Sequence, residues 1–421
     1  YPVIIAGLLI IGFFVGFASG SYPAFFLSSF KPVDVLKSGA MRGLRGSYLR
    51  RILVTIQFII TIVLFISTFV VNRQMNYIQS KELGFNKENL VVIDRAYVLD
   101  DQFESFRQEL LKNPSILQAS GSSAVPGGLI GDNAYLPEGA GTEETHAINN
   151  MWGDWHFDKT YALEITEGRW FREDNPTDSS ALILNEAAVK ALGFEDPLNK
   201  RLITAFGDDV GEPNQIIGVV KDFNFQSLHQ EIRPLVIQFP GFVPYKLSVR
   251  ISGNQTGKTL TYIEETWNSF IEQQPVHMTF LEEDLAALYN NDEKTATVFT
   301  IFSILAIFIA SLGLLGLASF SAAQRTKEVG IRKAMGASIP SVLVTLSKEF
   351  AWLILIATLA AWPIGYFFMK GWLQDYPARI SLEPMIFVIS TLIALFIAAV
   401  TVILRVYQAA SINPVYSLRY E

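Results

Sequence analysis

The stretch Ile52–Val71, ILVTIQFIITIVLFISTFVV, contains no charged side chain and decides the class of fold. The hydrocarbon core of a bilayer is about 30 Å thick, so about 20 helical residues with a rise of 1.5 Å each are needed to cross it. The basic residues Arg50, Arg51 and Arg73 flank the stretch. The segment therefore predicts a membrane-spanning helix, and the rest of the chain can be placed relative to it.

Four other stretches have the same apolar, charge-free character. They are Val3–Gly20, Thr297–Ala323, Phe350–Met369 and Pro384–Leu404. Only 17% of the 421 residues are charged, whereas soluble proteins usually contain about 25%. The sequence thus predicts a bundle of five membrane-spanning helices, in contact with the lipid bilayer.

Charge is distributed unevenly along the chain. Residues 73–293 carry a formal charge of −17, and the stretches before and after them carry +5 each. The loops that follow Val3–Gly20 and Thr297–Ala323 are rich in Lys and Arg. Because basic loops stay on the cytoplasmic side of a membrane, both loops and the C-terminus are expected inside, and residues 73–293 outside.

The acidic block 73–293 is long enough to bury a core of its own. Its strand-like and helix-like segments alternate, which predicts an α+β domain of two lobes inserted between two membrane helices. A stretch rich in Gly, Pro and Ser, Gly121–Gly141, predicts a long loop or a lobe boundary. The predicted strands are Leu90–Ile93, Ala181–Leu184, Gln215–Val220, Leu235–Phe239 and Lys246–Ile251, and the predicted helices are Asp101–Leu111, Glu186–Leu192 and Thr259–Gln273.

Two helices are expected to link this domain to the membrane. Val71–Gln79 continues the second span outward without a helix breaker, and the acidic stretch from Leu281 runs into the third span without Pro or Gly. The sequence predicts one continuous helix in each case. Two such helices form a stalk that can transmit movement, which a flexible Gly/Ser linker cannot do.

The two ends of the chain share a short motif. Phe30–Lys37 and Ile412–Arg419 both contain P-V-x-x-L followed by a basic residue, just after a membrane helix. Together with a start at Tyr1-Pro2, this predicts that the first helix ends a preceding repeat; the alternative is a complete five-span protein. The predicted segments are the last membrane helix of a preceding repeat (1–30), a basic inner linker (31–51), a membrane helix (52–72), the outer domain (73–293), a stalk and membrane helix (294–324), an inner coupling segment (325–349), a membrane helix (350–369), an outer loop (370–383), a membrane helix (384–404) and an inner tail (405–421).

The most informative stretch follows the third span and reads RTKEVGIRKAMGA (325–337). On a helix, Glu328 and Arg332 lie on one face, as do Val329 and Lys333. A basic anchor for lipid head groups explains the positive charges but not the internal glutamate, the apolar residues or the two glycines. The stretch therefore favours a helix that docks on another protein. The residues assigned to this docking site are Arg325, Glu328, Val329, Gly330, Arg332, Lys333, Met335 and Gly336.

Several motifs, in order, resemble those of FtsX-like or MacB-like permeases of ABC systems. They are R-x-L-V-x-x-Q-F (51–58), L-G-F (83–85), E-G-R-W-F (167–171), N-E-A-A (185–188), G-V-V-K-D-F (218–223), E-V-G-I-R-K-A-M-G-A (328–337) and N-P-V-x-x-L-R-Y-E (413–421). The resemblance implies a four-helix permease with a MacB-like periplasmic core domain, in a bacterial inner membrane. It also implies a cytoplasmic coupling segment that docks on a dimer of a separate ABC ATPase. A second permease unit, fused or separate, and a periplasmic adaptor are the other partners that it implies.

Other classes of function find little support in the sequence. No G-x-x-x-x-G-K-[ST] motif is present, so ATP binding through a P-loop is not expected, and no acidic or basic residue lies in mid-membrane as a proton relay requires. The chain has no cysteine, and its four histidines show no metal-ligand spacing, so a thiolate nucleophile, a Cys-ligated zinc site and a histidine-rich metal site are not expected. No catalytic residue, cofactor or nucleic-acid partner is predicted. The resemblance implies a permease subunit that transmits ATP-driven movement for export or extraction of a substrate such as an antimicrobial or a lipoprotein. The alternative is a membrane sensor with an outer ligand-binding domain and no transport.

Two further groups of residues have competing interpretations. Small residues on one helix face, at Gly12, Gly16 and Gly20 and again at Gly313 and Gly316, predict close helix packing rather than a substrate path. The tryptophans Trp152, Trp155 and Trp170 fit core packing better than a substrate groove.

Overall fold

A computed structural model describes residues 5–7, 9–10, 12–17, 20–21, 42–206, 209–239, 243–324, 328, 331–332, 335 and 338–410. The chain divides into two compact units. The helix unit comprises Tyr1–Leu64, Ser303–Ile364 and Val388–Glu421, and the domain unit comprises Phe65–Phe302 and Gly365–Phe387. Each unit is described separately below.

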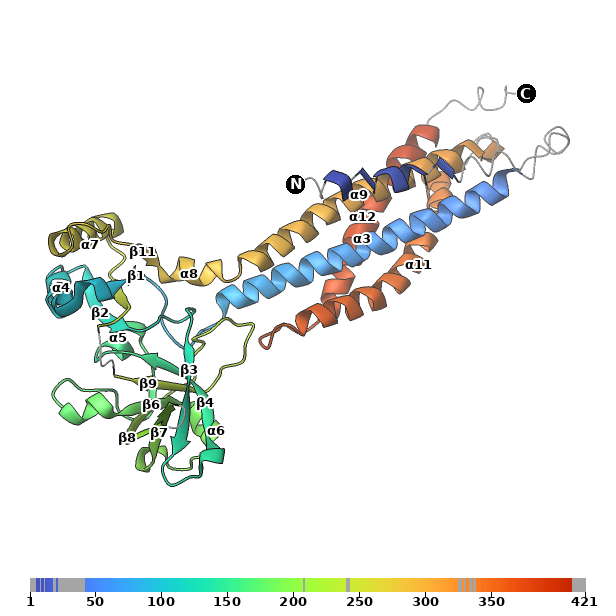
Figure 1. Cartoon of the computed structure of the whole chain (residues 1–421). Helices are drawn as coiled ribbons and strands as arrows, with labels where there is room; N and C mark the ends of the chain where they lie inside the picture. Colours follow the sequence, from blue (N-terminus) through green and yellow to red (C-terminus); the bar gives the residue numbers. More distant parts are fainter. Residues whose placement is uncertain are drawn as a thin grey trace. The chain divides into compact units, whose positions relative to one another are not determined.

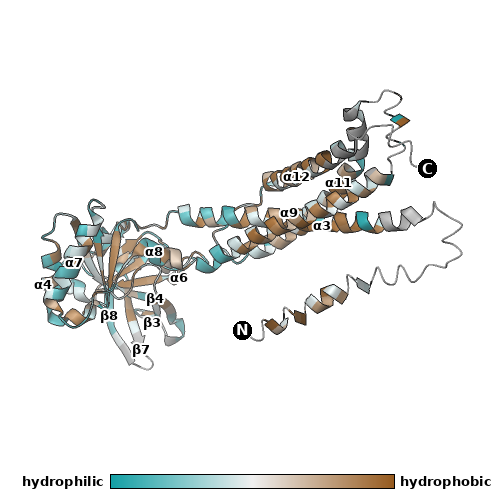
Figure 2. Ribbon diagram, turned by 90° about the horizontal axis from the view of Figure 1, so that it is seen from above, coloured by the Kyte–Doolittle hydropathy of each residue, from teal (hydrophilic) through white to brown (hydrophobic). Residues whose placement is uncertain are grey.

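Four long helices account for the predicted membrane spans. They are α3 (Arg42–Ser80), α9 (Asn290–Gln324), α11 (Ile339–Leu373) and α12 (Pro384–Ala410) (Figure 1). Apolar residues dominate all four, whereas the first turns of α9 are hydrophilic (Figure 2). Each helix contains a stretch long and apolar enough to cross a membrane, which confirms four of the five predicted spans. Within the predicted span Val3–Gly20 lies a shorter apolar helix, Ile5–Phe17, so the count of five stays a prediction.

The helix unit has an apolar core built by all four helices. Phe58 of α3, Leu314 of α9, Ala357 of α11 and Ala398 of α12 are almost fully buried in it. Many other apolar side chains of these helices are exposed, for example Phe396 at 69%. Exposed apolar side chains on long helices fit a lipid environment, in which they cost nothing.

The domain unit contains two β-sheets, as the prediction of two lobes requires. The smaller sheet has the strand order β11-β1-β10-β2 and is antiparallel, with Val92 of β1 opposite Ser248 of β10. Its strands are β1 (Leu90–Asp94), β2 (Ile116–Ser122), β10 (Lys246–Ile251) and β11 (Met278–Phe280). Two helices, α4 (Phe103–Leu110) and α7 (Thr256–Phe270), pack on it through Phe106 and Trp267, whose rings meet edge to face.

The larger sheet is mixed, with the strand order β5-β8-β6-β9-β4-β3-β7. The pairs β6–β8 and β4–β9 are parallel, and the other neighbours are antiparallel. The strands are β3 (Gly131–Pro137), β4 (His146–Trp152), β5 (Ile165–Gly168), β6 (Leu182–Asn185), β7 (Arg201–Phe206), β8 (Asp209–Val220) and β9 (Leu235–Gln238). The short helices are α5 (Phe157–Tyr161), α6 (Glu186–Leu192) and α8 (Leu281–Ala287), and the 3₁₀ turns are η1 (Ala96–Gln102), η2 (Thr142–Glu144), η3 (Pro176–Ser180) and η4 (Pro197–Asn199).

Most predicted elements of the domain are confirmed. The stretch Gly121–Gly141 does connect the two sheets, as a lobe boundary should, but the alternative of a long loop is partly wrong. Strand β3 lies inside it, because Tyr135 and Leu136 are buried and pair with β4 and β7. Only the first part of the stretch is irregular after β2 ends at Ser122.

The two linking helices behave differently. Helix α3 continues without a break to Ser80, as predicted. The prediction of one helix from Leu281 into the third span is wrong, because a turn at Leu288 and Tyr289 separates α8 from α9. Their backbone N–H groups bond to carbonyls three residues back, which tightens the chain at this point. Leu281 and Leu285 of α8 remain in the core of the domain.

Candidate functional site

The predicted docking segment lies in the helix unit, between α9 and α11. Four of its residues are described, namely Glu328, Ile331, Arg332 and Met335. The Arg332 Nη2 atom lies 2.6 Å from Glu328 Oε1, and both side chains are more than two-fifths exposed. The predicted i,i+4 pair on a helix face is therefore present.

Ile331 and Met335 add an exposed apolar pair to this segment. The Met335 N–H donates to the Ile331 carbonyl over 3.0 Å, the hydrogen bond of a helical turn. The Ile331 side chain is 45% exposed and that of Met335 is 77% exposed. Sequence reasoning assigned Met335 but missed Ile331, although their i,i+4 spacing was a signal for it. The other assigned residues, Arg325, Val329, Gly330, Lys333 and Gly336, lie outside the described part of the chain.

Charged contacts hold the helix ends next to this segment. The Arg51 guanidinium of α3 forms an ion pair with Glu349 of α11. The Arg50 guanidinium lies over the Phe320 ring of α9, 4.0 Å from its centroid, a cation–π contact. Three of the four long helices are thus connected at the end of the unit that carries Ile331 and Met335.

The predicted small-residue faces differ in what surrounds them. A Cβ atom built on Gly313 of α9 would overlap the Gln57 side-chain oxygen of α3, so glycine permits a close approach of these two helices. A Cβ at Gly316, Gly12, Gly16 or Gly20 would meet no described atom within 4 Å. Helix packing at these four glycines stays a prediction.

The C-terminal part of α3 contacts the loop between α11 and α12, within the domain unit. The Gln74 side chain is fully buried; its Nε2 donates to the Ala378 carbonyl over 2.8 Å, and its Oε1 accepts the Ile380 N–H over 3.0 Å. Arg73 forms a bidentate ion pair with Glu383, with N–O distances of 2.9 and 3.0 Å. The buried Gln74 amide satisfies two backbone groups of the loop that would otherwise lack a partner. It therefore contributes more to holding the loop on α3 than the exposed ion pair does.

A second polar contact joins three elements at the Asp292 carboxylate of α9. Tyr376, in the loop after α11, donates to Oδ1 over 2.7 Å, and His229 Nε2 lies 3.0 Å from Oδ2. Burial and the neighbouring Asp292 carboxylate raise the pKa of Tyr376, so its hydroxyl stays protonated and can donate. The His229 ring centroid lies 4.5 Å from that of Tyr376. We call Asp292, His229 and Tyr376 the Asp292 junction.

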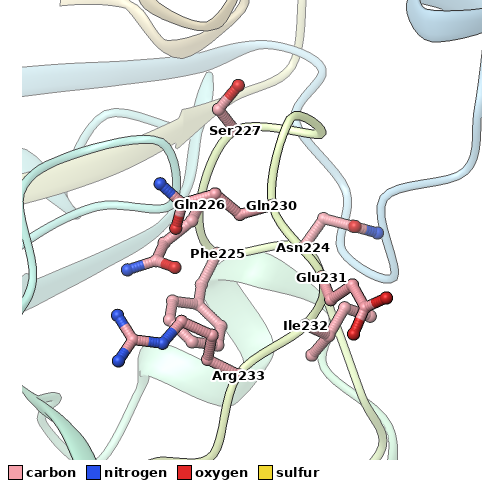
Figure 3. Close-up of a pocket in the computed structure, with 8 residues that line it drawn as sticks. All are labelled: Asn224, Phe225, Gln226, Ser227, Gln230, Glu231, Ile232 and Arg233. Carbon is pink, nitrogen blue, oxygen red and sulfur yellow. The ribbon is translucent and has the colours of Figure 1, made fainter. Parts of the chain in front are cut away.

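His229 belongs to a loop of the domain that follows β8. Asn224 anchors this loop, because its backbone N–H donates to the Leu83 carbonyl, just beyond the end of α3, over 2.7 Å. The Leu228 N–H donates to the Tyr289 hydroxyl over 2.9 Å. Asn224 and Glu231 point to one side of the loop and Arg233 to the other, around a pocket too narrow for a water molecule (Figure 3). The loop is thus a connecting element rather than a binding site.

Comparison with known proteins identifies the C-terminal part of the chain. Residues 300–414, which include most of α9, the docking segment, α11 and α12, match the model of the FtsX-like permease C-terminal family. The predicted resemblance is therefore confirmed for this part of the chain.

Solved structures similar to the chain each cover a little under half of it. The periplasmic region of MacB from Actinobacillus actinomycetemcomitans is 16% identical, with a TM-score of 0.37, over 48% of this chain and 94% of that structure. The extracellular domain of the ABC-type transporter YknZ from Gram-positive bacteria is 15% identical, with a TM-score of 0.34, over 45% of this chain and 98% of that structure. No curated protein matches the sequence significantly.

Proposed function

We propose that the chain is the permease subunit of an ABC-type system, in which ATP hydrolysis by a separate ATPase moves the outer domain. The family match over 300–414 is the observation that carries this proposal. It also favours a permease over a membrane sensor without transport. The subunit itself performs no catalysis in this scheme.

The docking segment receives the movement. Ile331 and Met335 offer an apolar contact, and Glu328 and Arg332 offer a charged one beside it. Side chains that only anchor a helix to head groups need neither an exposed apolar pair nor an acidic residue. The pattern supports a protein partner, with an apolar centre and a polar rim.

Continuous helices carry the movement outward. Helices α3 and α9 each run from the helix unit into the domain unit without interruption. At their outer ends, Gln74 and Asp292 bond to the α11–α12 loop, and Asp292 also bonds to the domain through His229. A displacement of α9 therefore reaches the domain through hydrogen bonds rather than through a flexible linker. The cargo is handled outside the membrane in this scheme, not in a pore between the helices.

We infer the orientation of the chain from the charge distribution, and its membrane and partners from the resemblance to FtsX-like permeases. The chain lies in a bacterial inner membrane, with the domain unit in the periplasm and the docking segment and C-terminus in the cytoplasm. A dimer of ATPase subunits is the inner partner. A second permease unit and a periplasmic adaptor complete the complex.

Charge reversal in the docking segment tests the proposal. Arg332→Glu removes the pair with Glu328 and places two acidic residues on one helix face, so ATPase activity of the reconstituted complex should fall. The swap Glu328→Arg with Arg332→Glu restores a pair within the helix, which itself contributes only about 0.2–0.5 kcal/mol. Activity that stays low in the swap shows contact with a partner. If both variants fold and the ATPase activity of the complex equals that of wild type in each, the docking role is refuted.

Normal activity only in the swap would mean that the pair merely stabilises the helix. Lys258→Glu, an exposed charge reversal on α7 of the domain unit, is the matched control and should leave ATPase activity unchanged. A second experiment tests the contact directly. Because the chain contains no cysteine, Met335→Cys provides a single site for attaching a photo-crosslinker, which should capture the ATPase subunit.

A further inference from the structure

A cavity of about 440 Å³ opens on the domain unit, away from the residues used above. Three groups of residues line it: residues of η1 with the start of α4, residues of the turn after β4, and Phe239, Val243 and Pro244. Its volume lies within the range of small-molecule sites, about 300–1,000 Å³. The cavity is therefore large enough for an organic molecule.

Aromatic side chains form one wall of the cavity. The Trp155 and Phe239 rings stack with centroids 3.8 Å apart and an angle of 24° between their planes. Both side chains are only partly buried, and Phe103 of α4 lines the same cavity. Of the three tryptophans weighed from the sequence, Trp155 thus lines a cavity, whereas Trp170 is buried and donates to the Asp154 carbonyl. A flat apolar ring can stack on the Trp155 wall.

Four carboxylate side chains line the cavity, Asp100, Asp101, Glu104 and Asp154. Two of them already accept hydrogen bonds from other residues of the domain. Glu104 accepts two hydrogen bonds from Arg107, at 2.9 and 2.6 Å. Asp154 accepts from Ser120 and from two backbone N–H groups, so it ties the turn after β4 to β2.

Asp100 and Asp101 are exposed, and within the described ranges no side chain pairs with either of them. These two carboxylates can face a ligand.

His156 also lines the cavity. Its Nε2 atom is buried, so this nitrogen does not face the cavity and offers no hydrogen bond to a bound molecule.

We propose that this cavity binds an organic cation with a flat apolar body. The aromatic wall attracts a cation over a ring face, and Asp100 and Asp101 add charge complementarity in a domain whose formal charge is −17. An anion meets repulsion from the same carboxylates. A metal ion is a poorer fit, because no group of three metal-ligating side chains occurs among the described residues. This site goes beyond the permease function and does not depend on an ATPase partner.

The test uses the full chain in nanodiscs of a zwitterionic lipid, with berberine, a planar aromatic cation, as the fluorescent probe. Wild type should bind it saturably and more weakly as salt is added. Asp101→Asn should weaken binding about threefold, and Trp155→Ala about tenfold. Glu143→Gln, an exposed carboxylate outside the cavity, is the matched control and should bind like wild type.

A neutral ligand of the same shape separates charge from stacking. Dihydroberberine should bind more weakly than berberine to wild type, and Asp101→Asn should reduce this preference. If Trp155→Ala does not fold, the double variant Asp100→Asn with Asp101→Asn carries the test. Binding that does not saturate, or that is equal in wild type and the cavity variants, overturns the proposal.

Discussion

The substitution Tyr376→Phe removes one hydroxyl from the Asp292 junction and should loosen the domain unit locally. Tyr376 is 2% exposed, and its hydroxyl donates to a carboxylate over 2.7 Å. Hydrogen bonds to charged groups contribute about 1.5–3 kcal/mol, and His229 still contacts the other oxygen of Asp292. The Asp292 side chain is 17% exposed, so a water molecule can partly replace the lost hydroxyl donor. We therefore expect the lower part of that range, about 1.5–2 kcal/mol.

Hydrogen exchange measured on the full chain in nanodiscs is the suitable assay, because it reports local opening. A loss of about 1.5–2 kcal/mol raises the open population about 10- to 30-fold. The Ile380 amide, which donates to the Gln74 side chain in the same loop, should exchange faster by this factor. Tyr97→Phe changes an exposed tyrosine of the domain and should leave Ile380 unaffected. Exchange at Ile380 within twofold of wild type in Tyr376→Phe would refute the assigned role of the junction.

Three other predictions concern helix packing, acid stability and topology. Gly313→Ala should be less stable than Gly316→Ala by up to about 1 kcal/mol in detergent unfolding, because its methyl group displaces the flexible end of the Gln57 side chain of α3, whereas no described atom lies near a methyl group at Gly316; equal effects would contradict this packing. The hydrogen-bonded guanidinium of Arg169 lowers the pKa of Asp178, so the stability from this pair is present above the ordinary aspartate pKa of about 3.9 and is lost as pH falls through the lowered folded value. The midpoint temperature of thermal unfolding should therefore fall more steeply with decreasing pH for wild type than for Asp178→Asn. Parallel pH profiles of the two proteins would count against this. In intact cells, an impermeant maleimide should label a cysteine in η2 but not Met335→Cys, and the reverse labelling would invert the proposed topology.

Membrane spans and regular elements of the domain could be predicted because their signals are local. The charge-free stretch Ile52–Val71 lies within α3, and the predicted segments Glu186–Leu192 and Lys246–Ile251 coincide with α6 and β10. In these segments, hydrophobic spacing and length report burial directly. The ends of the long helices were harder to predict, because polar residues continue each helix beyond its apolar stretch.

The break between α8 and α9 could not be predicted, since neither Pro nor Gly marks it. It depends on long-range contacts: Leu281 and Leu285 lie in the core of the domain, and the Tyr289 hydroxyl accepts a hydrogen bond from Leu228, far away in the sequence. Local propensity gives no information about such partners. The strand β3 escaped prediction for the same reason, because its neighbours β4 and β7 are what make it a strand.

The docking segment shows what motif reasoning can and cannot reach. The Glu328–Arg332 pair followed from i,i+4 spacing alone. The Asp292 junction did not, because its three residues come from separate parts of the chain and carry no common motif. Trp155 packs against the core of the domain, as the sequence favours, and it also lines the cavity, which sequence spacing does not indicate.

The central claim is that nucleotide-driven movement of the ATPase, received at the docking segment, changes the distance between the outer ends of α3 and α9. Spin labels on Ser80→Cys and Lys294→Cys, near the outer ends of α3 and α9, measure this in the complex with the ATPase. A non-hydrolysable ATP analogue should shift the distance distribution between the labels, and Arg332→Glu should abolish the shift. The same distribution with and without nucleotide, in a complex that hydrolyses ATP, would contradict the account.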